Sequence, residues 1–187
     1  MKQIVIANSG GLDSAIRCRQ FRDLGYQVHS LYIDFNRLGR EEEMIAAKKT
    51  ADEFCVSHHT IKVDLGYSPA HYESADSFVM QDDVVDGQEL SRYYAGPPNM
   101  PMIVMALTVS YAKSIGVNEC SGGYNAHLPQ ELFDIYNTAQ NLNLSLKLRP
   151  QMVAPDTMSR EELLTSLDYK AEDFNWVYDS HEIPEVT

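Results

Sequence analysis

The chain has 187 residues, of which 44% are hydrophobic, and its formal net charge at pH 7 is −12. This length suits a single domain with a sizeable core, and the hydrophobic content excludes wholesale disorder. The acidic balance argues against a general nucleic-acid binder, which needs a basic surface to displace counterions from phosphates, but it permits a phosphate site made of backbone N–H groups.

The first third of the chain alternates between strand and helix patterns. KQIVIA, at residues 2–7, has β-branched residues and no polar alternation, which is typical of a strand buried on both faces. Gly25 is expected to end the first helix in a left-handed conformation. In chain order, the pattern predicts a strand at 2–7, a helix at 13–24, a strand at 27–35, a helix at 39–54 and a strand at 58–65. This spacing predicts a parallel sheet with right-handed crossovers.

Residues 66–98 interrupt this alternation. They contain acidic residues, tyrosines and glycines without a clear period. A connection of this length inside a compact domain is usually functional, so we expect a lid, with a mere insertion as the alternative. The acidic stretch at 82–86 is interpreted as part of this lid rather than as a metal site.

A regular pattern returns at Asn99, a good N-cap residue, with Pro101 in the first helical turn. The helix that follows, to about residue 116, is apolar on nearly every face and is expected to be buried. Further elements are a short fourth strand within 118–125, a helix at 130–143, a fifth strand at 144–153 interrupted by Pro150, a capping box of Ser159 and Glu162, and an irregular acidic tail at 168–187. The expected fold is α/β: a single domain over 1–187 with one doubly wound five-stranded parallel sheet and helices on both faces.

The sequence SGGLDS, residues 9–14, lies between the first strand and the first helix, at the edge where open parallel sheets bind ligands. Its glycines allow a sharp turn and the close approach of an anion to backbone N–H groups, and the helix start adds partial positive charge. Ser9 and Ser14 add hydroxyl donors, so the loop predicts a phosphate cradle. It lacks the lysine of Walker A, the third glycine of the dinucleotide fingerprint and the G-x-S-x-G of a nucleophile elbow.

Asp13 has the wrong charge for a loop that only holds phosphate. It indicates Mg²⁺-bound pyrophosphate, since a divalent cation between the carboxylate and the phosphates removes their mutual repulsion. The alternative is that Asp13 only complements the helix dipole and the glycines only make a turn.

The loop resembles the pyrophosphate loop of the N-type ATP pyrophosphatases, or PP-loop enzymes, which cleave ATP between the α- and β-phosphates and transfer AMP to a substrate oxygen. Longer stretches, up to about residue 167, resemble the 7-cyano-7-deazaguanine synthases of queuosine biosynthesis. These stretches are GYQVHSLYIDFNRLGREEEMIAAKKTADEF at 25–54, YYAGPPNMPMIVMALTVSYAKSIGVNE at 93–119, GYNA at 123–126, QELFDIYNTAQNLNL at 130–144 and SREELL at 159–164.

The resemblance implies an ATP-dependent ligase that uses Mg²⁺ to adenylate 7-carboxy-7-deazaguanine and converts it with ammonia to the nitrile. It implies a small-molecule substrate, with no nucleic-acid or membrane partner, and it leaves a homodimer open. The implied catalytic residues are Asp13 and Ser14. The implied ATP-binding residues are Ser9, Gly10, Gly11, Leu12, Asp13, Ser14, Ile33, Asp34 and Asn99, and the implied substrate-binding residues are Gly123 and Asn125.

Three differences separate the chain from this family. The four C-terminal cysteines that bind structural zinc in the family are absent from residues 166–187, so no zinc is expected. HLPQ at 127–130 replaces a longer segment linked to the deazapurine. Pro98 stands where the family usually has arginine, and Arg160 where it has lysine. The compact synthases that mobile elements and viruses encode fit these differences. So do two alternatives: another AMP-transferring PP-loop enzyme, or a non-catalytic nucleotide-binding or structural descendant.

The remaining reactive side chains have simpler interpretations. The three cysteines, Cys18, Cys55 and Cys120, are scattered and are expected to be free buried thiols. His58 and His59 are interpreted as core or surface residues rather than ligands. The aromatic residues of the tail, Phe174, Trp176 and Tyr178, either pack inward, over the region of the missing zinc site, or form a partner surface. No apolar run approaches the ~20 residues that span a bilayer, and no signal-like segment precedes the first strand, so the sequence predicts a cytoplasmic protein.

Overall fold

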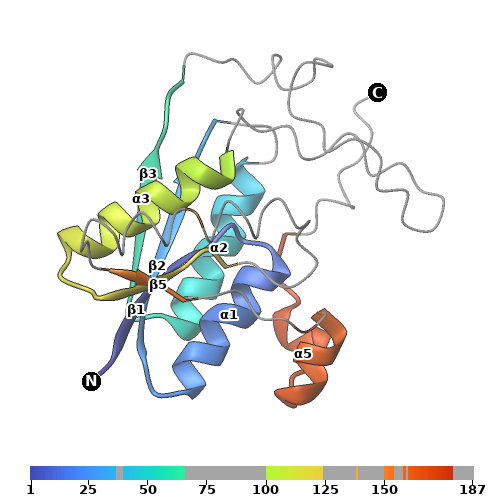
Figure 1. Ribbon diagram of the computed structural model, residues 1–187. Helices are drawn as coiled ribbons and strands as arrows, with labels where there is room; N and C mark the ends of the chain where they lie inside the picture. Colours follow the sequence, from blue (N-terminus) through green and yellow to red (C-terminus); the bar gives the residue numbers. More distant parts are fainter. Residues whose placement is uncertain are drawn as a thin grey trace, which may run out of the picture.

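The computed structural model describes residues 1–36, 40–65, 100–123, 138, 150–153, 158 and 160–178. Its centre is a five-stranded parallel sheet in the order β3-β2-β1-β4-β5 (Figure 1). The strands are β1 (Gln3–Ala7), β2 (Gln27–Asp34), β3 (Ser57–Lys62), β4 (Glu119–Ser121) and β5 (Gln151–Met152). The predicted α/β fold with a five-stranded parallel sheet is confirmed.

Strand β1 is buried on both faces because helices cover both sides of the sheet. Ile4 and Ile6 pack with helices α1 and α2, whereas Val5 points to the other face and packs with helix α3. All three side chains are fully buried. The continuous apolar run in the sequence therefore serves two cores, one on each face. The helices are α1 (Leu12–Asp23), α2 (Arg40–Phe54) and α3 (Met100–Ser114).

The winding of the chain reverses between β1 and β4. Helices α1 and α2 alternate with β1, β2 and β3 in one direction and lie together on one face of the sheet (Figure 1). Helix α3 precedes β4, which pairs with the opposite side of β1, and α3 lies on the other face. Right-handed crossovers require this change of face whenever the strand order reverses.

Helix α3 is buried along one face only, so the expectation of burial on nearly every face is wrong. Met105, Thr108 and Ala112 are buried at helical spacing, whereas the Met102 side chain is 39% exposed. The Thr108 hydroxyl donates to the Val104 carbonyl at 2.6 Å, which satisfies it inside the core. A helix on a sheet buries the side that it presents to the sheet, whatever the composition of its outer side.

Residues 160–178, called the C-terminal segment below, lie beside α1 (Figure 1). Arg19 on α1 binds Asp173 at 2.6 Å, and the same guanidinium lies over the ring of Tyr169 at 3.9 Å. These contacts tie the segment to α1. The segment contains two short helices, α5 (Arg160–Ser166) and the 3-10 helix η2 (Ala171–Phe174).

The aromatic residues of the C-terminal segment pack inward. Phe174 is 1% exposed, and its ring centroid lies 6.0 Å from that of Phe54 on α2 and 6.0 Å from that of Tyr169. The indole of Trp176 stands 5.9 Å from Phe54 and donates from Nε1 to the buried Thr50 Oγ1 at 3.1 Å. Of the two interpretations of this aromatic group, inward packing is therefore correct for Phe174 and Trp176.

Several predicted elements lie wholly or partly outside the described residues. These are the lid at 66–98, the helix at 130–143 apart from a helical Thr138, the first part of the strand at 144–153, and residues 179–187 of the tail. Elsewhere the predicted bounds differ from the observed ones by a few residues, as at β3, which ends at Lys62. Among the described residues, no helix has both the length and the apolar character to cross a membrane.

Candidate phosphate-binding site

The loop at residues 8–11 follows β1, at the point where the winding of the sheet reverses. The turn after β4 comes back against this loop. Gly123 in that turn has a φ of +70°, and a Cβ there would lie 2.3 Å from the Ala7 carbonyl oxygen and 3.2 Å from Ser14 Cβ. Open α/β sheets bind ligands in the crevice formed at such a reversal, so the loop and the turn form the candidate site.

Gly10 lets the loop pack directly on α2. Its φ is +84°, and a Cβ there would lie 2.4 Å from the Glu43 carbonyl oxygen and 3.1 Å from the Ala47 nitrogen. Both neighbours are backbone atoms, so no side chain fits. A Cβ at Gly11, in contrast, would meet nothing closer than Ser9 Oγ at 3.5 Å. The two glycines of the motif therefore differ: Gly10 allows packing, and Gly11 leaves one side of the loop open.

The Asn8 side chain holds the loop from beneath, although the sequence pattern gave no prediction for it. Asn8 is 1% exposed. Its Oδ1 accepts from the Gly10 N–H at 3.1 Å and from Ser14 Oγ at 3.2 Å, and its Nδ2 donates to Ser30 Oγ at 3.0 Å and to the Ala47 carbonyl at 2.9 Å. An asparagine directly after a buried strand could have indicated this role, because a buried amide must find hydrogen-bond partners inside the protein.

The start of α1 brings hydrogen-bond donors to the open side of the loop. Gly11 is the N-cap, and no side chain among the described residues caps it, so the first N–H groups remain directed at the loop. Ser14 Oγ lies 2.8 Å from the Gly11 carbonyl and 3.5 Å from the exposed Ser9 Oγ. The side chain of Leu12 packs against the core, so only its backbone faces the loop.

Asp13 forms an ion pair with Arg160, at the start of α5. Arg160 Nε donates to Asp13 Oδ1 at 2.7 Å, and the two side chains are 48% and 34% exposed, respectively. An ion pair this exposed contributes at most about 1 kcal/mol to stability, so it can exchange partners at little cost. Arg160, noted in the sequence only because it replaces a lysine of the family, brings a guanidinium to the loop.

The C-terminal segment touches the loop at its other end as well. The Tyr178 N–H donates to the Gly10 carbonyl at 2.9 Å. The Tyr178 carbonyl oxygen lies 3.9 Å from the position of a Cβ on Gly11. Together with the Arg160 ion pair, this contact makes the segment part of the wall of the candidate site.

The two residues predicted to lie near adenosine, Ile33 and Asp34, point to opposite faces of β2. Ile33 packs on the α3 side. Asp34 is buried on the α2 side, and its Oδ1 accepts from the Asn36 N–H at 2.8 Å, which holds a turn where Asn36 has a φ of +58°. Two further predicted site residues, Asn99 and Asn125, lie outside the described residues.

Arg17 places a buried positive charge beside the same crevice. It is 4% exposed, and its Nε donates to Ser121 Oγ, at the end of β4, at 3.4 Å. Its Nη1 donates to Gln20 Oε1 at 2.7 Å, and its guanidinium lies over the Phe21 ring. A buried guanidinium at the reversal point raises the electrostatic potential near the loop. The sequence pattern gave no prediction for Arg17.

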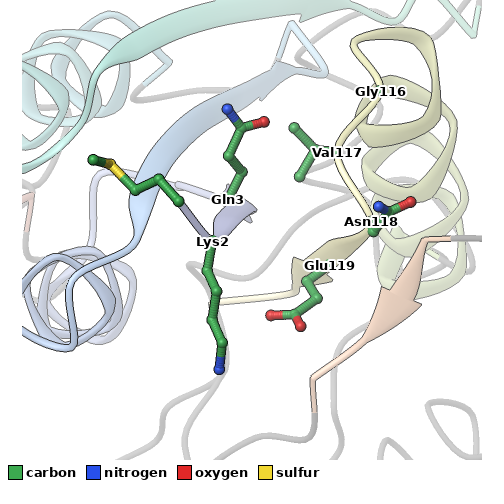
Figure 2. Close-up of a pocket in the computed structure, with 7 residues that line it drawn as sticks. Lys2, Gln3, Gly116, Val117, Asn118 and Glu119 are labelled. Atoms are coloured by element: carbon green, nitrogen blue, oxygen red, sulfur yellow. The ribbon is translucent and has the colours of Figure 1, made fainter.

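A cavity of about 220 Å³ lies at the end of the sheet opposite the glycine loop (Figure 2). It opens at the amino ends of β1 and β4, whereas the glycine loop follows the carboxyl end of β1. The cavity is therefore separate from the candidate site. Its lining residues are Met1, Lys2, Gln3, Gly116, Val117, Asn118 and Glu119.

The three cysteines are free thiols, as predicted, but only Cys18 and Cys120 are buried, whereas Cys55 is half-buried. Burial raises the pKa of the Cys120 thiol to about 12, so it stays protonated and is a poor nucleophile at neutral pH. A hydrogen bond with Cys55, together with burial, raises the pKa of Cys18. Among the residues that the structure describes, no three His, Cys, Asp or Glu side chains gather into a metal site.

A five-stranded parallel sheet with this glycine loop at its reversal point defines an α/β domain of the PP-loop, or adenine nucleotide alpha-hydrolase-like, class. Among solved structures, NMN synthetase from Francisella tularensis has a similar fold, with a TM-score of 0.52 at 17% sequence identity. The match covers 95% of this chain and 66% of that one.

The family follows from the sequence comparisons. The family model described as "Queuosine biosynthesis protein QueC" matches residues 3–131, more than half of the chain, and the chain belongs to this family. The 7-cyano-7-deazaguanine synthase of Microcystis aeruginosa is 29% identical over 167 residues, which is 84% of this chain and 72% of that protein. The synthase of Stenotrophomonas maltophilia is 27% identical over 130 residues, so the matched part spans only 55% of its length.

Proposed function

We propose that the protein is an ATP-dependent carbon–nitrogen ligase that adenylates 7-carboxy-7-deazaguanine and converts it with ammonia to 7-cyano-7-deazaguanine, releasing AMP and pyrophosphate. The observation that carries the proposal is the SGGLDS loop at the reversal point of the sheet, inside the stretch matched by the QueC model. The loop supports the use of ATP. The names of the curated relatives support the substrate.

In this proposal the ATP phosphates bind at the open side of the loop. The hydroxyls of Ser9 and Ser14 and the N–H groups at the start of α1 would bind the β- and γ-phosphates and then the departing pyrophosphate. The buried Arg17 and the partly exposed Arg160 add positive charge nearby. The chain contributes positioning and stabilisation of phosphate charge rather than a covalent nucleophile.

The side chains at the loop also fit Mg²⁺. This cation is held in nucleotide sites by one or two carboxylates together with phosphate oxygens. Asp13 supplies a partly exposed carboxylate next to the loop, and the ion pair that joins it to Arg160 is exposed as well. When bound, Mg²⁺ would neutralise phosphate charge, and Asp13 would hold it.

A second candidate is an AMP-transferring PP-loop enzyme that acts on a different substrate. It is favoured by the extent of the family match, which ends at residue 131. Arg160 and Tyr178, which contact the loop from the C-terminal segment, lie beyond that point. These two residues can therefore give the chain a different substrate preference from that of the synthases.

The test is a reaction with ATP, Mg²⁺, ammonium and 7-carboxy-7-deazaguanine, in which released pyrophosphate is measured and products are identified by mass. We expect AMP, pyrophosphate and the nitrile. Asp13→Asn should lower the rate by about 100-fold, because a neutral amide holds Mg²⁺ less well and the phosphate charge is then less neutralised, with little change in stability. Asp168→Asn is the control, since Asp168 lies in an exposed turn away from the loop.

Each other outcome selects an alternative. AMP transfer that yields no nitrile would favour the second candidate. Tight ATP binding without turnover would favour a non-catalytic descendant of the family. Absence of ATP binding would contradict the assignment of the loop itself.

A further inference from the structure

The buried amide of Asn8 has only one orientation that satisfies its surroundings. Its oxygen faces two donors, the Gly10 N–H and the Ser14 hydroxyl, and its nitrogen faces two acceptors, Ser30 Oγ and the Ala47 carbonyl. Reversing the amide would set N–H against N–H at Gly10 and oxygen against oxygen at Ala47. This one side chain therefore joins the loop to both β2 and α2.

The hydrogen-bond chain continues from Asn8 across the sheet. Ser30 is fully buried and lies opposite His58 in the register of β2 and β3. Its Oγ accepts a hydrogen from Asn8 Nδ2 and stands 2.9 Å from His58 Nδ1. In the arrangement proposed here, the Ser30 hydroxyl accepts from Asn8 and donates its own hydrogen to His58 Nδ1. His58 is then a neutral ring with its hydrogen on Nε2.

We propose that Asn8 is the positioning residue of the phosphate loop and that neutral His58, acting through Ser30, holds Asn8 in its productive orientation. The effect on nucleotide affinity rests on the proposed function. The effect on the order of the loop does not, since it follows from the hydrogen bonds alone.

Protonation of His58 would disturb this arrangement. A protonated ring donates from Nδ1, so the Ser30 hydroxyl would have to turn its own hydrogen away and accept from both Asn8 and His58. Burial lowers the pKa of His58, the charges of Lys48 and His59 lower it further, and Asp52 opposes them. The loop should therefore be well ordered at neutral pH and loosen in the acidic range.

The same two strands contain a matched control. Ser57 Oγ lies 2.8 Å from His29 Nδ1, so a serine and a histidine pair across β2 and β3 here as well. His29 alternates with Ser30 along β2 and therefore faces the other side of the sheet. In the described part of the chain, the hydrogen bond of this second pair leads to neither Asn8 nor the loop.

The experiment compares Ser30→Ala with Ser57→Ala in the full chain. Amide hydrogen exchange in residues 8–14 is measured without nucleotide, and the dissociation constant for Mg·ATP is measured separately. We expect Ser30→Ala to speed loop exchange and to weaken Mg·ATP binding by about tenfold each, the effect of losing one buried hydrogen bond. Ser57→Ala should leave both unchanged.

His58→Asn supplies a second test, which stands even if Ser30→Ala does not fold. Asparagine can place its oxygen near the position of Nδ1 but cannot be protonated. This variant should bind Mg·ATP like the wild type at pH 8 and about tenfold more tightly than the wild type at pH 5.5.

Equal loop exchange in the two serine variants, or equal pH dependence of Mg·ATP binding in the wild type and His58→Asn, would overturn the inference. A wild type that fails to bind Mg·ATP, with Ser30→Ala still loosening the loop, would instead contradict the proposed function alone.

Discussion

At the scale of single residues, backbone contacts distinguish glycines that look alike in the sequence. Four of the described glycines have a positive φ, but only Gly10 and Gly123 also face backbone atoms at less than 3 Å. The motif at residues 9–14 indicates the first of them. The second could not be explained from sequence, because its contact with Ala7 depends on the pairing of β4 with β1.

Replacing Gly123 with alanine should lower the free energy of unfolding by about 3 kcal/mol. The left-handed backbone costs about 1 kcal/mol for a residue with a Cβ, and the 2.3 Å approach to the Ala7 carbonyl oxygen adds about 2 kcal/mol of overpacking. Gly25→Ala is the matched control, since Gly25 has a φ of +81° and open space around it, and should cost only the first amount. Urea unfolding measures both, and equal losses would contradict the packing argument.

The position of the glycine loop between β1 and α1 was predictable from sequence because its residues are contiguous. Its supports were not. Arg160 and Asp13 are 147 residues apart, and Asn8 depends on partners from β2 and α2. Such partners become visible only when the order of the strands and the faces of the helices are known.

At the scale of elements, α1 and α2 follow from the strand–helix spacing, with bounds close to those predicted. The extent of burial of α3 does not follow from its sequence. Composition indicates which residues can be buried, but not how many faces of the helix contact another element. The C-terminal segment was left open between inward packing and a partner surface, because its aromatic residues have no helical or strand period.

Phe174→Ala should detach the C-terminal segment from α1 and α2. Phe174 is 1% exposed and contacts Phe54, Tyr169 and Trp176, so its truncation should cost about 4 kcal/mol. Urea unfolding measures the loss, and limited proteolysis should cut residues 160–178 first. Asn175→Ala, at the exposed neighbouring position, is the control. A cost below about 1 kcal/mol for Phe174→Ala would mean that the segment is not anchored by this ring.

At the scale of the whole molecule, titratable groups link stability to pH at both faces of the sheet. Burial lowers the pKa of His29 on the α3 side and of His58 on the α2 side. Between α1 and the C-terminal segment, a hydrogen bond from Arg19 lowers the pKa of Asp173. Protonation of the histidines changes stability near neutral pH, and protonation of Asp173 changes it only below the ordinary pKa of an aspartate, 3.8.

Stability should be constant from about pH 8 down to about pH 6.5, the ordinary pKa of histidine, and fall as the pH drops below it. In that range the unfolded chain binds protons at His29 and His58 that the folded chain resists, so protons favour unfolding. Below pH 3.8, protonation of Asp173 should add a second loss. Urea unfolding from pH 8 to pH 5 tests the first step, with the double variant His29→Asn, His58→Asn as control. The same dependence of the unfolding free energy on pH in the wild type and the double variant would show that these histidines are not its cause.

The two contacts of the C-terminal segment with the loop have a consequence for biosynthesis. The ribosome makes residues 9–14 well before Arg160 and Tyr178, although these residues meet in the folded protein. A nascent chain can pair β1, β2 and β3 early, because their contacts are local. It still lacks this wall of the candidate site until residues 160–178 have left the exit tunnel.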